Sequence, residues 1–128
     1  MFDHERLEVY KLQVQFIGWA TQLLEEVEQQ CSRKTREVRT HLDEASVSVL
    51  LNIAEGNGKR QRQVRAKFFD DARGSATECA ACLDALVAKT ACTLERVQPS
   101  KAMLERVVSM LTKLVARFDT DDPGTSEQ

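Results

Sequence analysis

The sequence predicts an all-α protein, an up-down-up-down antiparallel four-helix bundle that forms one domain over residues 1–118. Hydrophobic residues make up 42% of the 128-residue chain but aromatic residues only 5%, a balance typical of helices packed through aliphatic side chains. Proline occurs twice and glycine five times. Apolar residues recur at three- and four-residue spacing along four stretches with short connections, which favours a bundle.

The first helix is expected from about residue 5 to residue 30. Its apolar stripe consists of Leu7, Tyr10, Val14, Ile17 and Leu24, which follow one another at helical spacing. Trp19 lies off this stripe, where it either fills a gap against a neighbouring helix or contacts another subunit. The polar residues 31–35 then predict a short connection, with Ser32 or Thr35 as the cap of the next helix.

The second helix is apolar on two sides. One side carries Val38, Leu42, Ala45, Val49 and Asn52, and the other carries Val47, Leu50, Leu51 and Ala54. Only one side of a helix can face the core of a small bundle, so the second side predicts self-association.

Two glycines, Gly56 and Gly58, interrupt the pattern and predict a helical hairpin. Gly56 is expected to end the helix in the left-handed conformation, which costs glycine nothing, and Gly58 to let the chain reverse. Counting outward from this break at the helical rise, the register predicts three polar pairs: Glu55–Arg62, Asn52–Arg65 and Asp43–Arg73.

The third helix is expected from about residue 62 to residue 91 and the fourth from residue 99 to residue 118. Gly74 lies in the middle of the third helix, where it costs about 1 kcal/mol relative to alanine, so we expect another helix to cross closely there. Pro99 suits the first turn of the fourth helix, with an irregular turn from Leu94. Residues 119–128 hold no apolar side chain and predict a disordered acidic tail.

Positive charge gathers after the glycine break although the chain as a whole carries −2. Between residues 59 and 73, six basic residues face two acidic ones, a local charge of +4. Guanidinium groups suit phosphates, but no exposed aromatic residues are interleaved, so contact with the nucleic-acid backbone is indicated and base reading is not. The candidate nucleic-acid-binding residues are Lys59, Arg60, Arg62, Arg65 and Lys67; the alternative is an ordinary solvated face.

Other candidate chemistry in the sequence is weak. Cys79 and Cys82 have the spacing of a metal or redox motif but lie within a helix with no second ligand pair, so the four cysteines are interpreted as reduced core residues. The hairpin register brings His41 near Ser75 and Glu78, but no oxyanion hole accompanies them, which favours a buried hydrogen bond. We expect no catalytic residues, no metal and no cofactor.

The N-terminus lacks the basic and apolar regions of a signal peptide, and no run of about 18 apolar residues follows. A cytoplasmic protein is expected.

Several motifs together carry a family resemblance. The segments Asn52-Ile53-Ala54-Glu55-Gly56, Gly58-Lys59-Arg60, Phe68-Phe69 and Ala72-Arg73-Gly74-Ser75, followed by Glu78, resemble the signature of the bacterial four-helix-bundle proteins encoded in intervening sequences of large-subunit ribosomal RNA genes. This family also includes the accessory variability protein of diversity-generating retroelements. The resemblance covers about residues 5 to 118.

The resemblance implies a non-enzymatic bundle that assembles into a homopentamer with a basic surface or channel. In the retroelement branch, the family binds nucleic acid and a reverse transcriptase. Arg60, Arg62 and Arg65 fall where the family is basic. Asp43 and Glu44 depart from the pattern because relatives tend to be basic there, which argues against a nucleic-acid channel and favours pairing of Asp43 with Arg73. The residues that match the structural motif are Asn52, Glu55, Gly56, Gly58, Arg73, Gly74, Ser75 and Glu78.

The sequence and the resemblance together predict an oligomeric accessory or scaffold protein for nucleic acid or for a nucleic-acid enzyme. The alternative is a structural protein–protein interaction module whose basic residues pair only with its own acidic residues and with neighbouring proteins.

Overall fold

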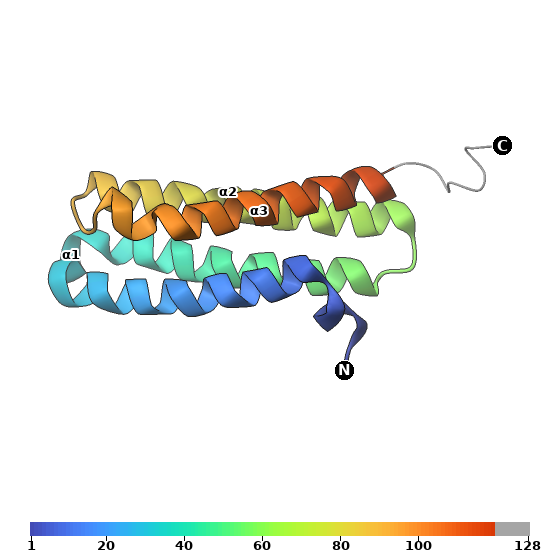
Figure 1. Cartoon of the computed structure of the whole chain (residues 1–128), viewed down its shortest axis with the longest axis horizontal. Coiled ribbons are helices and arrows are strands. Elements are labelled where there is room, and N and C mark those ends of the chain that lie inside the picture. The colour runs from blue at the N-terminus through green and yellow to red at the C-terminus, as the bar shows by residue number, and fades with distance from the viewer. Residues whose placement is uncertain (120–128) are drawn as a thin grey trace.

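The computed structural model describes residues 1–119, and these residues are helical almost throughout (Figure 1). A short 3₁₀ helix, η1 (Asp3–Arg6), precedes three α-helices: α1 (Glu8–Gly58), α2 (Arg62–Ala88) and α3 (Leu94–Phe118). No strand occurs within the described residues, so the predicted all-α class is confirmed. The predicted acidic tail lies, from residue 120 onward, outside the described residues.

The prediction of four separate helices is wrong, because the first two are one element. Helix α1 is 51 residues long and departs from helical geometry at Cys31, where φ is −141° and ψ is 48°. There it folds back on itself, so residues 8–30 and 32–58 form two antiparallel arms (Figure 1). Gln13 ties the arms together by donating a 2.9 Å hydrogen bond from Nε2 to the Ser46 carbonyl. Three helices therefore supply four helical rods.

The expected connection at residues 31–35 is absent because side chains hold the backbone at the bend. Thr35 donates from Oγ1 to the Cys31 carbonyl at 2.6 Å, and Arg39 donates from Nη2 to the Ser32 carbonyl at 2.7 Å. Both bonds run from side chains of the second arm back to carbonyl groups at the bend, and they tie its first turns to the point of reversal. A loop is not needed for the reversal.

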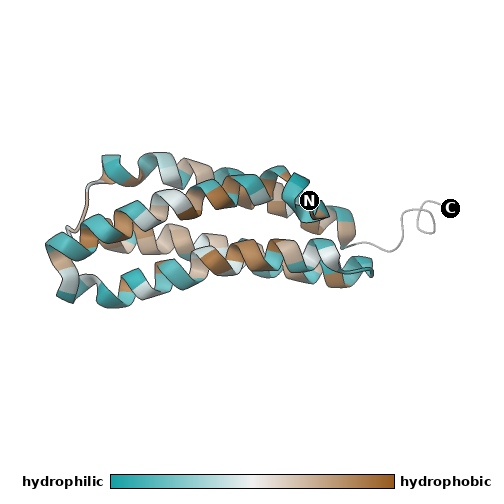
Figure 2. Ribbon diagram, turned by 90° about the horizontal axis from the view of Figure 1, so that it is seen from below, coloured by the Kyte–Doolittle hydropathy of each residue, from teal (hydrophilic) through white to brown (hydrophobic). Residues whose placement is uncertain are grey.

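The core runs the length of the rods and is mainly aliphatic. Hydrophobic and hydrophilic residues alternate along every helix (Figure 2), which places one face of each rod inward. Trp19 is half-buried, packs against Phe16 with ring centroids 5.9 Å apart, and lies 5.0 Å from the Arg96 guanidinium of α3. It thus contacts a neighbouring helix, one of the two positions expected for it. The largest fully buried side chains include Phe16, Leu23, Leu42, Ile53, Phe69, Leu83, Leu86, Leu104 and Leu111.

Gly56 and Gly58, at the end of α1, act differently from the prediction. No glycine within residues 1–119 has a positive φ, and α1 continues through Gly56 to Gly58. Gly56 is buried against α2, where an added Cβ would lie 3.0 Å from Phe69 Cε1. It is needed for close packing and not for a left-handed turn. Gly74 shows the opposite error, since an added Cβ would meet nothing within 4 Å and no helix crosses closely there.

Helix α3 begins five residues before the predicted start at Pro99. The Thr93 side chain accepts a 3.1 Å hydrogen bond from the Arg96 backbone N–H, which caps the helix at Leu94. Pro99 therefore lies inside the helix and beyond its first turn, contrary to the expectation. A good cap outweighs the missing proline donor.

Within residues 1–119, no helix combines the length and the apolar content that crossing a bilayer requires.

Candidate nucleic-acid interface

Two of the candidate nucleic-acid-binding residues, Arg62 and Arg65, hold helix ends together near the turn between α1 and α2. Arg65 donates from Nη1 to the carbonyl groups of Asn57 (3.1 Å) and Lys59 (3.0 Å), at the C-terminal end of α1. Arg62 donates to the carbonyl of Arg117 at the end of α3. Cations are favourable at helix C-termini, where the carbonyl groups carry partial negative charge. These two arginines therefore have a structural role as well as a charge.

The Phe118 ring is surrounded by three arginines at the same end of the molecule. The Phe118 ring lies 5.0 Å from the guanidinium of Arg62, 4.6 Å from that of Arg65 and 5.1 Å from that of Arg117. Cations within about 6 Å of a ring face are attracted by its electrons. Arg117 was not among the predicted residues, because it lies far along the chain and only the antiparallel packing of α3 brings it here.

The two predicted lysines sit beside a second ring, and both are paired. Lys59 and Lys67 lie 5.3 Å and 5.6 Å from the centroid of the Phe68 ring. Lys59 pairs with Glu55 and Lys67 with Asp71, each at 3.2 Å. Their charges are thus partly compensated within the chain.

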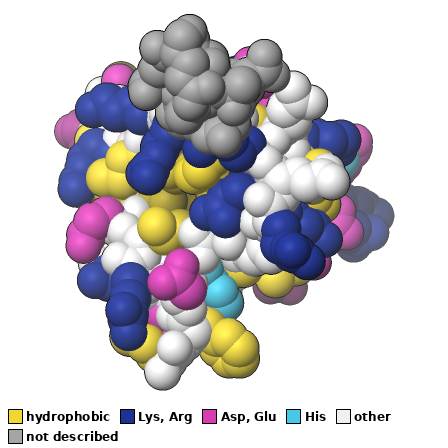
Figure 3. Space-filling view, turned by 90° about the vertical axis from the view of Figure 1, so that its right-hand side faces the viewer, with side chains coloured by type: hydrophobic (Ala, Val, Ile, Leu, Met, Phe, Trp, Pro, Cys, Tyr) yellow, Lys and Arg dark blue, Asp and Glu magenta, His cyan; other side chains and the backbone are white. Residues whose placement is uncertain are grey.

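Four arginines at this end have no such compensation. Among the described residues, no carboxylate oxygen lies within 4.0 Å of the guanidinium nitrogens of Arg60, Arg62, Arg65 or Arg117. We call these four residues together with Lys59 the basic end. Lys and Arg side chains gather around a small hydrophobic area on this face of the molecule (Figure 3). A local excess of positive charge remains although the chain carries −2 in total.

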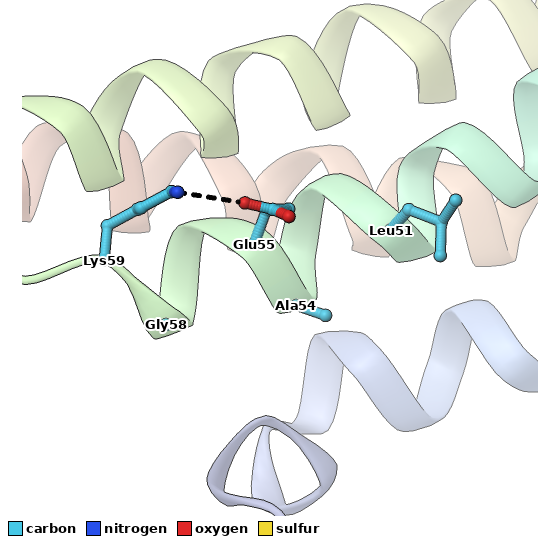
Figure 4. Close-up of a pocket in the computed structure, with 5 residues that line it drawn as sticks. All are labelled: Leu51, Ala54, Glu55, Gly58 and Lys59. Atoms are coloured by element: carbon cyan, nitrogen blue, oxygen red, sulfur yellow. Dashed lines mark ion pairs between the residues drawn. The ribbon is translucent and has the colours of Figure 1, made fainter.

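An open hollow adjoins the basic end. It has a volume of about 390 Å³ and is lined by Leu51, Ala54, Glu55, Gly58 and Lys59, all on α1, with the Lys59–Glu55 ion pair running along the helix (Figure 4). A second hollow of about 300 Å³ shares Gly58 and Lys59 and extends to Arg60. The positive groups therefore border an uneven surface.

The three predicted polar pairs do not form. Glu55 pairs with Lys59, and Arg73 pairs with Asp70 and donates to Thr112 Oγ1 at 3.3 Å. The predicted register is wrong because α1 continues to Gly58, so the reversal lies at residues 59–61.

The motif residues instead form a hydrogen-bonded link between α1 and α2. Ser48 Oγ lies 3.1 Å from Ser75 Oγ, and Asn52 donates from Nδ2 to the Ser48 carbonyl at 2.9 Å. The Ser48–Ser75 contact joins α2 to the second arm of α1, and Asn52, which also donates to Ser48 Oγ at 3.2 Å, bonds only within α1. The structural role of the motif stays a prediction, and the partners expected for Asn52 and Glu55 are not the ones found.

The expected neighbours of His41 are only partly correct. His41 Nδ1 lies 3.7 Å from Glu78 Oε2, and His41 Nε2 lies 3.8 Å from Glu37 Oε1. Ser75 is bonded to Ser48 instead. The imidazole is exposed, so the buried hydrogen bond predicted for it is wrong.

The four cysteines form no disulfide with one another. Cys79 and Cys82 are buried in the core as predicted, whereas Cys31 and Cys92 are only partly buried. Burial, and to a smaller extent the neighbouring Cys82, raises the pKa of Cys79 to about 12. Burial likewise raises the pKa of Cys82. Within residues 1–119, no group of three His, Cys, Asp or Glu side chains is placed to hold a metal ion.

A second surface is apolar and lies on α1. Val14, Val47 and Leu51 are 47%, 40% and 59% exposed, whereas Leu50 and Ala54 are half-buried. The Gln13–Ser46 hydrogen bond puts Val14 and Val47 at the same level of the two arms. The predicted second apolar side of this segment is thus partly uncovered in a single chain.

The fold and these surfaces define an all-α protein built of antiparallel helical rods. One end carries four arginines that pair with no carboxylate of residues 1–119, and the longest helix carries an apolar face. Residues 5–113 match the family model of the 23S rRNA-intervening sequence protein. The chain belongs to this family. Neither the curated proteins nor the solved structures give a match to the chain.

Proposed function

We propose that the protein is a non-enzymatic, homo-oligomeric scaffold of the bacterial cytoplasm that binds the phosphate backbone of nucleic acid through its basic end. The observation that carries the proposal is the group of four arginines, Arg60, Arg62, Arg65 and Arg117, with no carboxylate partner among the described residues.

The chemistry of these groups favours phosphates. A guanidinium offers a planar fork of donors that matches two phosphate oxygens. Arg62 and Arg65 are fixed by hydrogen bonds to carbonyl groups and by the Phe118 ring, so they are ordered before a ligand arrives. The nearby rings are covered by their own cations, which supports backbone contact without base stacking.

The proposal is tested by the salt dependence of binding. Fluorescence anisotropy with a labelled RNA duplex of about 20 base pairs, in about 50 to 200 mM KCl, should give a linear fall of log affinity with log salt. The variant Arg60→Gln/Arg117→Gln removes two exposed charges and should reduce the slope by about 1.5 to 2. It leaves Arg62 and Arg65 in place, so the helix ends stay bonded.

Arg106→Gln is the matched control. Arg106 is exposed on α3 and lies outside the basic end, so its replacement should change the slope little. Equal slopes of log affinity against log salt for the double variant and the wild type would rule out the basic end as the binding site. The same titration with a DNA duplex of equal length asks which nucleic acid is preferred.

The oligomer is proposed to be a pentamer, as the family resemblance implies. Exposed Val14, Val47 and Leu51 support assembly through α1, because exposed apolar patches of this kind mark contact surfaces. In an oligomer, each chain adds a basic end, so a modest local charge is multiplied. The resemblance to the accessory variability protein makes a nucleic-acid enzyme such as a reverse transcriptase the proposed protein partner.

The second candidate function is a structural protein–protein interaction module with no nucleic-acid binding. The uncovered apolar residues of α1 favour it, since they serve a protein partner as well as another copy. An oligomer that shows no salt-dependent affinity for either duplex would select this function over the first.

A further inference from the structure

The molecule carries a second cluster of basic side chains at the end opposite the basic end. Helix α1 bends there at Cys31, and the turn between α2 and α3 lies beside the bend (Figure 1). An open hollow of about 470 Å³ includes Arg33, Lys34, Arg36 and Lys89 in its lining. We call these four residues the bent end.

The charges of the bent end are also uncompensated. All four side chains are exposed, and none has a carboxylate oxygen within 4.0 Å among the described residues. Glu37 also lines the hollow, but it lies 3.8 Å from His41 Nε2. The nearby Arg39 is not part of this cluster, because it pairs with Glu28 and donates a hydrogen bond to the Ser32 carbonyl at the bend.

A strained residue forms part of this end. Thr90 has a φ of 58°, the only positive φ of a residue other than glycine within residues 1–119. This conformation is unfavourable for a β-branched side chain. The backbone N–H of Ala91 donates to the Leu86 carbonyl at 3.0 Å, the pattern of helices that end in a left-handed glycine. Thr90 Oγ1 accepts a 3.3 Å hydrogen bond from Lys34 Nζ, which links the turn to the bend. Strain of this kind gathers at functional sites.

The two ends stand well apart. From Lys34 to Lys59 the second arm of α1 rises by about 38 Å at 1.5 Å per residue. The nine residues of the two clusters are half of the chain's 18 Lys and Arg. Outside the two clusters, residues 1–119 hold nine Lys and Arg against 17 Asp and Glu, so the rest of the described chain is acidic on balance and repels phosphate. A polyanion is therefore attracted to the ends.

We propose that the bent end is a second phosphate-backbone site, so that one chain holds two segments of nucleic acid at opposite ends. This inference rests on the proposed function. The hollow is open and not enclosed, and its charges lie on long flexible side chains, which suits an extended backbone better than a small ligand that needs burial on most sides.

The test counts binding sites with a short probe. An RNA duplex of about 8 base pairs is shorter than the roughly 27 Å of a B-DNA duplex of equal length, because RNA is A-form. It is therefore too short to reach both ends of one chain. Isothermal titration calorimetry at low salt should give two duplexes per wild-type chain. Arg33→Gln/Arg36→Gln/Lys89→Gln should bind one, whereas Arg33→Lys/Arg36→Lys, which keeps the charge, should still bind two. Arg106→Gln should bind two as well.

The outcomes separate the inference from the proposed function. Two duplexes per chain in the triple variant, with an unchanged circular dichroism spectrum, would overturn the bent-end site and leave the proposed function standing. A single wild-type site that is weakened by Arg60→Gln/Arg117→Gln would do the same. No salt-dependent duplex binding at all would overturn both. A calorimetric titration with inorganic pyrophosphate tests for a small-anion site. If the triple variant loses pyrophosphate binding but still binds two duplexes, the bent end takes a small anion and the inference is wrong.

Discussion

At the scale of single residues, Gly56 is the position where the structure leaves least room. Its backbone packs against the Phe68 and Phe69 side chains, and an added Cβ would lie 3.0 to 3.1 Å from their atoms. Phe69 is fully buried and cannot move into solvent. The glycine is therefore required by the approach of α2.

We predict that Gly56→Ala lowers the free energy of unfolding by about 1 to 3 kcal/mol, the usual cost of overpacking. Gly74→Ala is the control, because a Cβ there meets nothing within 4 Å; it should raise the free energy by about 0.5 to 1 kcal/mol through helix propensity. Urea denaturation measures both. A Gly56→Ala protein as stable as Gly74→Ala would contradict the close packing.

Cys79 couples ionisation to stability. Its pKa is about 12 in the folded protein against an ordinary 9.0, because burial disfavours the thiolate. A raised folded pKa means that the neutral form stabilises the fold. This contribution is complete below pH 9 and is lost as the pH rises from 9 toward 12.

We therefore predict that the free energy of unfolding falls above pH 9 and that Cys79→Ala makes this fall less steep. Urea titrations at several pH values between 8 and 10.5 compare the two slopes. Cys82 contributes in the same direction, so part of the slope should remain in the variant. Parallel curves for the two proteins would rule out the effect of Cys79.

At the scale of elements, the arginines of the basic end divide into two kinds. Arg65 bonds three acceptors at the end of α1 and stacks on Phe118 of α3. Arg60 is exposed, and no hydrogen bond of its side chain occurs among the described residues. Arg65 therefore holds two helices in place, whereas Arg60 only contributes charge.

We predict that Arg65→Gln lowers the free energy of unfolding by about 1.5 to 3 kcal/mol, the range for hydrogen bonds to charged groups. Arg60→Gln should change it by less than about 0.5 kcal/mol, as surface substitutions do. Thermal melts followed by circular dichroism provide the comparison. Equal melting temperatures would mean that Arg65 does not fasten the end of α1.

The helical periodicity predicts most elements, because it records which side of each helix faces the core. It predicts the bounds of α2, the end of α3 and the second arm of α1, which is apolar on two sides, to within a few residues. It misses the continuity of α1, since Cys31–Thr35 reads as a polar connection while the bond from Thr35 Oγ1 to the Cys31 carbonyl exists only in the folded chain. A local pattern also cannot tell that Thr93 caps α3 before Pro99.

The site is predictable in composition but not in arrangement. Local charge identifies Arg60, Arg62 and Arg65, yet Arg117 enters only through long-range packing. The expected pairs fail because a small error in the position of the reversal shifts every residue across the hairpin. The bent end joins residues 33–36 to Lys89, which no local run of charge reveals.

At the scale of the whole molecule, the apolar residues of α1 decide whether copies associate. Leu51 is 59% exposed and lies beside the hollow of the basic end. Burying such a side chain contributes about 1.5 to 3 kcal/mol. Several copies of this contact repeated around an oligomer would hold it together.

We predict that the wild-type protein has five times the 14.5 kDa mass of one chain and that Leu51→Glu reduces this mass, because a buried charge is costly. Leu94→Glu is the control, since Leu94 is similarly exposed (51%) but lies at the start of α3. Light scattering coupled to gel filtration reports both. A wild-type monomer at micromolar concentration would contradict assembly through α1.

Both ends of the described chain emerge beside the basic end (Figure 1). Asn57 donates from Nδ2 to Asp3 Oδ2 at 2.9 Å, which fastens the start of the chain to the end of α1, while Phe118 closes α3 among the arginines. An affinity tag or a fusion partner at the N-terminus would therefore crowd this face, and a polyhistidine tag there would change its charge. Immobilisation or dye labelling through the turn at residues 89–93 would keep the basic end accessible, at the expense of the bent end.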